Sequence, residues 1–152
     1  IPSRILGLWN KDDAITTPNE HAIACYLGDP LLMQGGSKNP YSRAYIELYE
    51  RLPDVYAKGR FFADKGLSGI PEKVKVSVKA GADRFVVTVY NLNETDVEFG
   101  LKIDLSAIGY GGREIARVSG AIKRQNFYAF ADNSFTVRAG MNSIESYLVE
   151  MK

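Results

Sequence analysis

Acidic residues follow directly after the first apolar segment of the chain. Residues 4–9 form an almost continuous apolar run that ends at Trp9, and Asp12 and Asp13 come just after it. Where strands alternate with helices, the C-terminal ends of the strands face the active site. Carboxyl groups there suit hydrolysis of a glycosidic bond, in which one protonates the leaving oxygen and another attacks or activates water. Trp9 would offer a ring face to a sugar, and Gln34, at the end of a second short apolar run, would hydrogen-bond a hydroxyl.

The same four residues also fit a purely structural interpretation, which the sequence favours. The two aspartates would then be solvated loop charges, Trp9 would belong to the core, and Gln34 would only end a strand. The reacting carboxyl groups of glycosidases lie about 5 to 10 Å apart across the bond, and two adjacent aspartates do not easily straddle a substrate. We therefore assign Trp9, Asp12, Asp13 and Gln34 as candidate substrate-binding residues and assign no catalytic residue.

Other kinds of site find little support in the sequence. One cysteine, Cys25, and one histidine, His21, allow no internal disulfide and make a structural zinc site unexpected. No serine stands in a nucleophile motif, and the glycine-rich stretch 109–112 lacks the lysine of a phosphate-binding loop. We expect neither a metal nor a cofactor.

Composition sets limits on the partners. Nineteen basic and eighteen acidic residues leave a net charge of +1, so we expect no nucleic-acid partner. No apolar run approaches the ~20 residues that span a membrane, so we expect no membrane partner. Low cysteine use leaves the compartment open, the periplasm and the extracellular space included. The chain begins at Ile1 rather than Met, which fits a processed product or an internal fragment.

The chain divides into two parts near residues 65–71, a stretch with two glycines and a proline. Before it, residues 1–65 predict strand, helix, strand, helix, the rhythm of a βα-repeat and here the end of a barrel. The first helix should start at Thr17 and Pro18 with a capping box. The second should follow Pro40, and Pro53 should break it.

The second part, residues 72–152, predicts an all-β antiparallel sandwich. Apolar and polar residues alternate along about seven short segments with turns between them. The clearest alternation runs over 97–105 and places Phe99 and Leu101 in the core; residues 126–130 are predicted as one strand. The fold class is therefore mixed, with a short βαβα barrel-end segment followed by the sandwich.

Three stretches resemble known carbohydrate-active enzymes. Residues 16–32 resemble the last barrel segment of alpha-galactosidase-type glycoside hydrolases, and residues 46–60 resemble the helix that follows. Asn91 matches an asparagine often found near the end of the second sandwich strand. Alpha-amylases have a similar junction, so the sugar linkage stays open. The resemblance implies the C-terminal region of a retaining glycosidase, whose catalytic aspartates lie on earlier barrel strands.

Two hypotheses for function follow. In the first, the chain is the C-terminal portion of a glycoside hydrolase, its sandwich is an accessory or stabilising domain, and its partners are the rest of a catalytic barrel and carbohydrate. In the second, it is a non-catalytic carbohydrate-binding or structural module. Aromatic side chains on the strands are then the candidates for holding sugar: Tyr110, Phe127, Tyr128, Phe130 and Tyr147.

We predict that the isolated 152-residue chain does not hydrolyse glycosides. A barrel assembles its cleft from the loops of several strands in ~250 residues, and only two barrel-like strands are expected here. The measurement is an assay of the purified chain against aryl α- and β-glycosides. Turnover that disappears in the Asp12→Asn or Asp13→Asn variant would contradict the prediction.

Overall fold

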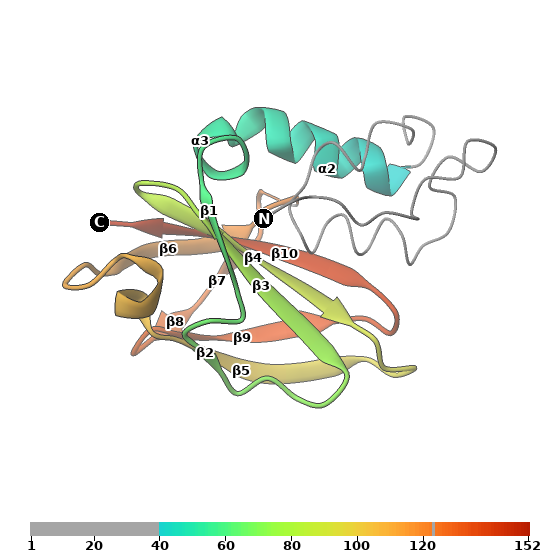
Figure 1. The fold of residues 1–152 in the computed structure, drawn as a ribbon. Helices are drawn as coiled ribbons and strands as arrows, with labels where there is room; N and C mark the ends of the chain where they lie inside the picture. The colour runs from blue at the N-terminus through green and yellow to red at the C-terminus, as the bar shows by residue number, and fades with distance from the viewer. Residues whose placement is uncertain (1–39, 123) are drawn as a thin grey trace.

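A computed structural model describes residues 40–122 and 124–152 of the chain (Figure 1). The candidate residues Trp9, Asp12, Asp13 and Gln34 lie outside the described residues, as do the strands and the first helix expected before residue 40. The barrel-end assignment of residues 1–65 therefore stays a prediction.

The described residues contain two antiparallel sheets. The strand order is β1-β3-β4-β10-β6-β7 in the six-stranded sheet and β2-β5-β9-β8 in the four-stranded sheet. The strands are β1 (Arg60–Ala63), β2 (Leu67–Ser68), β3 (Val74–Ala80), β4 (Arg84–Asn91), β5 (Val97–Ile103), β6 (Ile115–Gly120), β7 (Phe127–Tyr128), β8 (Phe130–Ala131), β9 (Ser134–Ala139) and β10 (Ile144–Met151). The predicted all-β sandwich is confirmed, and β1 and β2 bring residues from before position 72 into it.

The main core lies between the two sheets and follows the period-two pattern of the sequence. In β3, Val74, Val76 and Val78 are buried, while Lys75 is exposed. Leu101 of β5 and other apolar side chains of the four-stranded sheet meet them from the opposite side. Because successive side chains of a strand point to opposite faces, this alternation decides which face of each sheet turns inward.

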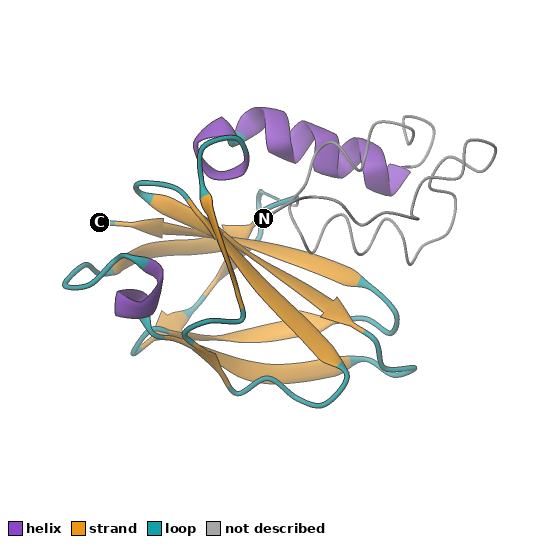
Figure 2. Cartoon of the chain, viewed as in Figure 1, coloured by secondary structure: helices purple, strands orange, loops and turns teal. Residues whose placement is uncertain are grey.

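A helical layer covers the outer face of the six-stranded sheet (Figure 2). It consists of α2 (Pro40–Arg51) and the short α3 (Pro53–Tyr56). Tyr45, Leu48 and Leu52 recur at helical spacing and are buried against the sheet. The described part of the molecule is thus a helical layer, a six-stranded sheet and a four-stranded sheet stacked in that order.

The predicted break at Pro53 is confirmed. Helix α2 ends at Arg51, Leu52 adopts φ −121° and ψ 58°, and Pro53 opens α3. A proline disfavours helical geometry in the residue before it and suits the first position of a new helix. The chain therefore changes direction at Leu52, whose side chain stays in the core beneath both helices.

Asn91 is a fully buried polar residue at the end of β4. Its side-chain amide nitrogen lies 2.9 Å from the carbonyl oxygens of both Thr95 and Gly140, and its side-chain oxygen accepts a hydrogen bond from the Asn93 amide at 3.0 Å. Buried amides need such partners, since an unpaired one costs about 1–3 kcal/mol. Asn91 therefore ties the β4–β5 turn to the end of β9.

The expected strand 97–105 is wrong at its end. Strand β5 stops at Ile103, and residues 105–108 form a 3₁₀ turn in which the Ser106 amide donates to the Asp104 carboxylate at 3.0 Å. A capping aspartate favours a turn over continued pairing. Leu101 is buried as predicted, whereas Phe99 is only partly buried and packs against the edge of the core.

The single strand expected over 126–130 is also wrong. The chain forms two short strands there, and they belong to different sheets. Phe127 of β7 pairs with Ser119 of β6, whereas Phe130 of β8 pairs with Phe135 of β9. The segment therefore crosses from one sheet to the other, which an alternation pattern over five residues does not reveal.

We predict that Leu101→Ala lowers the free energy of unfolding by about 2–5 kcal/mol, because the substitution leaves a cavity between the sheets. Phe99→Ala should cost less, since its ring is partly exposed, and Lys102→Ala, at an exposed neighbouring position, serves as the control. Urea denaturation followed by circular dichroism gives all three values. Equal midpoints for Leu101→Ala and Lys102→Ala would show that the observed register is wrong.

Candidate functional site

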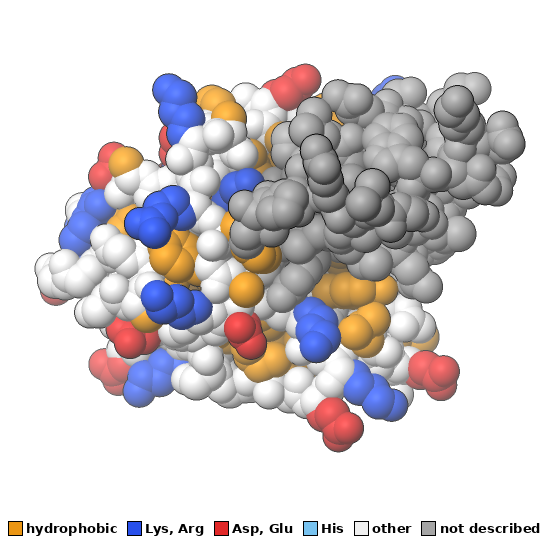
Figure 3. Space-filling view, in the orientation of Figure 1, with side chains coloured by type: hydrophobic (Ala, Val, Ile, Leu, Met, Phe, Trp, Pro, Cys, Tyr) orange, Lys and Arg blue, Asp and Glu red, His pale blue; other side chains and the backbone are white. Residues whose placement is uncertain are grey.

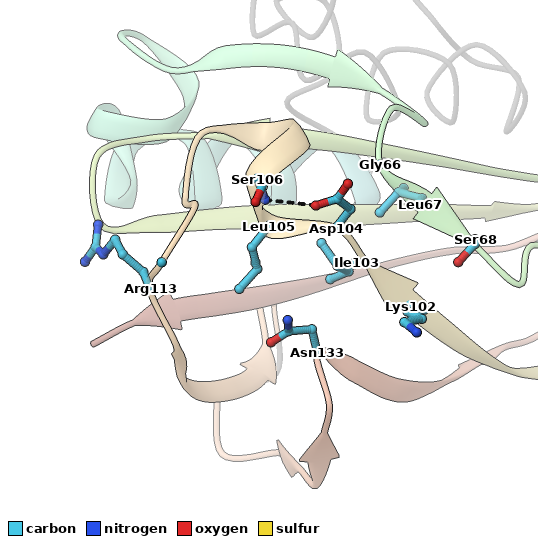
Figure 4. Close-up of a pocket in the computed structure, with 11 residues that line it drawn as sticks. Gly66, Leu67, Ser68, Lys102, Ile103, Asp104, Leu105, Ser106, Arg113 and Asn133 are labelled. Atoms are coloured by element: carbon cyan, nitrogen blue, oxygen red, sulfur yellow. Dashed lines mark hydrogen bonds between the residues drawn. The ribbon is translucent and has the colours of Figure 1, made fainter.

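A hollow of about 510 Å³ lies at one end of the sandwich, where several loops meet (Figure 4). The β1–β2 turn contributes Gly66, the end of β5 contributes Lys102 and Asp104, and the β8–β9 hairpin contributes Asn133. Arg113 borders the hollow from the loop before β6. Residues from four separate stretches of the chain are therefore brought together at this end.

Backbone hydrogen bonds fix the walls of the hollow. The Asp104 amide donates to the Gly66 carbonyl at 2.7 Å, and the Ile103 amide donates to the Asn133 carbonyl at 2.9 Å. Gly66 has φ +75°, and a Cβ there would approach the Ala107 side chain to 2.8 Å, so this position requires glycine. Asn133 has φ +58° in the hairpin turn, a conformation that asparagine tolerates.

Arg113 is held rigidly at the rim. Its guanidinium donates to the Ala82 carbonyl at 2.9 Å and to the Lys152 carbonyl at 2.8 Å, and it pairs with Asp83 at 3.1 Å. The same group lies 5.8 Å from the centre of the Tyr110 ring. These contacts use most of the donors of Arg113 and fix its position beside the hollow.

The Tyr110 ring is buried beneath Arg113, and its hydroxyl donates to the Gly81 carbonyl at 2.5 Å. Burial raises the pKa of Tyr110 to about 12, although the neighbouring Arg113 opposes the shift. Tyr147, between the sheets, likewise has its pKa raised to about 12 by burial. Both hydroxyls are therefore neutral structural groups at ordinary pH rather than bases or nucleophiles.

The described lining of the hollow suits binding of polar groups. Lys102, Ser106 and Asn133 offer hydrogen-bonding groups to a polar ligand such as a sugar hydroxyl. Asp104 is the one carboxylate among the lining residues that the structure describes, and one of its oxygens already accepts from Ser106. Both glycosidase mechanisms require two carboxyl groups.

Of the five aromatic candidates, the structure leaves two clearly exposed. Tyr110 and Tyr147 are buried, and Tyr128 is partly buried with its ring 5.1 Å from that of Tyr147. Phe127 is 61% exposed and Phe130 is 39% exposed. These two stand on strands of different sheets, β7 and β8.

The residues of the hollow were not predicted from the sequence. Apart from Lys102, at the end of β5, they lie on loops, and no motif joins Gly66, Lys102, Asp104, Arg113 and Asn133. The available signals were local turn features, namely the Asp132-Asn133 hairpin turn and the Asp104 cap.

Residues 40–122 and 124–152 hold no cluster of metal-ligating side chains and no helix long and apolar enough to cross a membrane. Basic and acidic side chains intersperse on the described surface in Figure 3.

No protein-family model matches the sequence, and a comparison with curated proteins found no match. Solved structures with a similar fold do exist. An Anoxybacillus alpha-amylase has a TM-score of 0.56 at 13% identity, over 89% of this chain and 33% of its own. A Bacteroides fragilis protein assigned as an alpha-galactosidase or melibiase has a TM-score of 0.57 at 14% identity, over 88% of this chain and 29% of its own.

An alpha-amylase from Geobacillus thermoleovorans, solved with acarbose, has a TM-score of 0.52 at 14% identity, over 80% of this chain and 23% of its own. The resemblance seen in the sequence to alpha-galactosidase-type and alpha-amylase enzymes is therefore confirmed at the level of the fold. This chain spans a third or less of the length of these glycoside hydrolases. The likeness establishes a shared architecture and leaves activity to be argued separately.

We predict that stability falls between pH 10 and pH 12. Tyr110 and Tyr147 hold their protons more tightly in the folded state than in the unfolded state, where the pKa is about 10. Their contribution to the free energy of unfolding is complete below pH 10. It is lost as the pH rises towards 12, by up to about 1.4 kcal/mol per pH unit for each group. Tyr110→Phe should flatten this slope. Parallel stability curves for the variant and the wild type would contradict the assignment.

Proposed function

We propose that this chain is the C-terminal portion of a carbohydrate-active enzyme, a glycoside hydrolase, in which the sandwich is an accessory domain that stabilises the segment before it. The observation that carries the proposal is the helical layer packed on the outer face of the six-stranded sheet. An independent sandwich does not need such a layer, because its outer faces are usually solvated.

The contact between helices and sheet is apolar and closely fitted. Leu48 and Val55 are fully buried, and they pack in one cluster with Val86 of β4 and Ile144 of β10. Burying a side chain of this size contributes about 1.5–3 kcal/mol. Tyr45, Leu52, Tyr56 and Tyr90 extend the cluster. The helical segment and the sandwich therefore stabilise each other.

Three buried hydroxyl groups, linked by hydrogen bonds, cross the same interface. Tyr45 of α2 and Ser146 of β10 share a hydrogen bond of 2.8 Å between their side-chain oxygens, and Ser146 and Thr88 of β4 share one of 3.1 Å. Polar groups buried in pairs add specificity, because a different docking of the helix would leave them without these partners. The helix is thereby held in one orientation on the sheet.

The structural neighbours support the enzyme part of the proposal. Proteins named alpha-amylase and alpha-galactosidase contain this architecture within chains about three times as long or longer. On this proposal a catalytic barrel supplies the remaining length and is the principal partner of the sandwich. Trp9, Asp12, Asp13 and Gln34 keep their proposed role in contacting carbohydrate, and the catalytic carboxyl groups lie outside this chain.

A second candidate function rests on the polar hollow beside Asp104. A non-catalytic module would bind neutral sugar there through Lys102, Ser106 and Asn133. The two functions differ in one respect that is simple to measure. A binding module retains neutral oligosaccharides by itself and loses them in Asn133→Ala, whereas a stabilising domain does not bind them at all.

The test uses the complete open reading frame that carries this chain. We predict that its product hydrolyses an aryl glycoside and that Leu48→Ala leaves kcat/KM at 25 °C within about twofold while shortening the half-life of activity on heating. The variant removes about 2–5 kcal/mol of packing between α2 and the six-stranded sheet. Glu47→Ala, at an exposed position on the same helix, is the matched control. A product without glycosidase activity, or equal half-lives for the two variants, would refute the proposal.

A further inference from the structure

A second hollow, of about 190 Å³, lies beside the helical layer on the outer face of the six-stranded sheet. We call it the arginine groove, since Arg51, Arg84, Arg117 and Arg124 all line it. Leu52, Leu148 and Phe127 provide the apolar part of its wall. The volume is below the ~300–1,000 Å³ typical of sites for drug-sized ligands, so it suits a single ring or a single charged group.

Strand register explains why the arginines gather. Arg84 of β4 lies opposite Glu150 of β10, and Glu150 lies opposite Arg117 of β6, so the three form a row across the sheet. The next outward-facing position of β10 is Leu148, paired with Val86, which the helices cover. Arg51, at the end of α2, extends over the sheet, and its guanidinium donates to the Ala121 carbonyl.

The groove carries an excess of positive charge. Asp54 pairs with Arg84 through hydrogen bonds of 2.9 and 2.7 Å, which also lower the pKa of that carboxyl group. Glu150 pairs with Arg117 at 2.6 Å. Two carboxylate groups therefore neutralise two of the four guanidinium groups at the groove. Among the described residues, neither Arg51 nor Arg124 has an ion pair with a carboxylate.

The two remaining cations act on each other. The pKa of Arg51 is lowered by burial first and by the charge of Arg124 second. Glu47 opposes this shift only as the weakest of its causes. Since neither guanidinium group has a carboxylate ion pair among the described residues, an anion between them would relieve their repulsion. Arginine also presents paired donors that match the two oxygens of a carboxylate or phosphate.

Phe127 adds an apolar surface to this charge. Its side chain is 61% exposed, and the Arg117 guanidinium lies 5.6 Å from the centre of the ring. Leu52 and Leu148 lie in the same wall. A ligand that fits both features carries an oxyanion on a compact ring with an apolar face, and a flat aromatic surface is the usual complement of such a face.

We propose that the arginine groove binds an anionic sugar unit, a ring that bears a carboxylate or a phosphate group. Arg51 and Arg124 would hold the oxyanion, and Phe127 would contact the ring. The anionic part of the proposal rests on the groove alone. The choice of a sugar rests on the proposed role in a carbohydrate-active enzyme.

The test is calorimetric titration of the full 152-residue chain with digalacturonic acid, with a neutral galactose disaccharide, with a sugar phosphate and with inorganic phosphate. We expect saturable binding of an anionic sugar, by carboxylate or phosphate, and none of the neutral disaccharide. Arg124→Gln and Arg51→Gln should each weaken that binding at least about tenfold, through the loss of one charge-assisted contact. Phe127→Ala should weaken the binding of anionic sugar more than the binding of inorganic phosphate.

Arg138→Gln is the matched control, because Arg138 is an exposed arginine on the four-stranded sheet, paired with Glu98 at 2.7 Å. It should leave binding unchanged. Equal binding of the neutral disaccharide, or anionic sugar binding unaffected by Arg124→Gln, would overturn the proposal. Inorganic phosphate binding without any anionic sugar binding would overturn its sugar part. None of these outcomes depends on glycosidase activity, so the failure of the proposed enzyme function would be seen separately.

Discussion

The central strands β4 and β10 are buried on both faces, and this double burial governs the arrangement of the other elements. In β4, Val87 faces the four-stranded sheet whereas Val86 faces the helices, and both are almost fully buried. A strand with apolar side chains on both faces requires a cover on each side, because either face left in water would lose its hydrophobic stabilisation. The four-stranded sheet provides one cover, and helices α2 and α3 provide the other.

This requirement accounts for the local structure before the sandwich. The break at Pro53 lets α2 and α3 lie over the same sheet while Leu52 remains in the cluster beneath them. The chain then turns into β1 at Gly59, where a Cβ would clash with the carbonyl oxygens of Val55 and Ala80. Strand β1 pairs directly with β3. The helical segment and the sandwich are therefore joined by backbone pairing as well as by packing.

Much of the sandwich could be predicted from the sequence, because apolar and polar residues alternate along a strand that has one buried face. Strand β5 was expected from the alternation over 97–105 for this reason, and it begins at Val97 as predicted. The same rule could not predict β4 as doubly buried, since a continuous apolar run looks alike in several folds. It also extended β5 past Ile103, because Leu105 continues the alternation and only the Asp104 cap marks the turn.

The candidate sites could not be predicted in the same way. The hollow beside Asp104 and the arginine groove each join side chains from segments far apart in the chain, and cross-strand register decides which of them meet. Phe127 shows the limit clearly. It was one of five aromatic candidates, and its exposure beside Arg117 follows from the crossing of the chain between sheets after β7, which no local pattern records.

Native-state hydrogen exchange of the 152-residue chain tests most directly whether the helical layer and the sandwich form one unit. The informative amides are those of Leu52 and Tyr56, which donate to Leu48 and Leu52 carbonyls at 3.0 and 2.9 Å, and that of Val87 in β4. The account predicts that all three open with free energies within about 1 kcal/mol of one another and converge as denaturant is added, because the layers unfold together. Helix amides that exchange through an opening several kcal/mol easier than that of Val87 would contradict it.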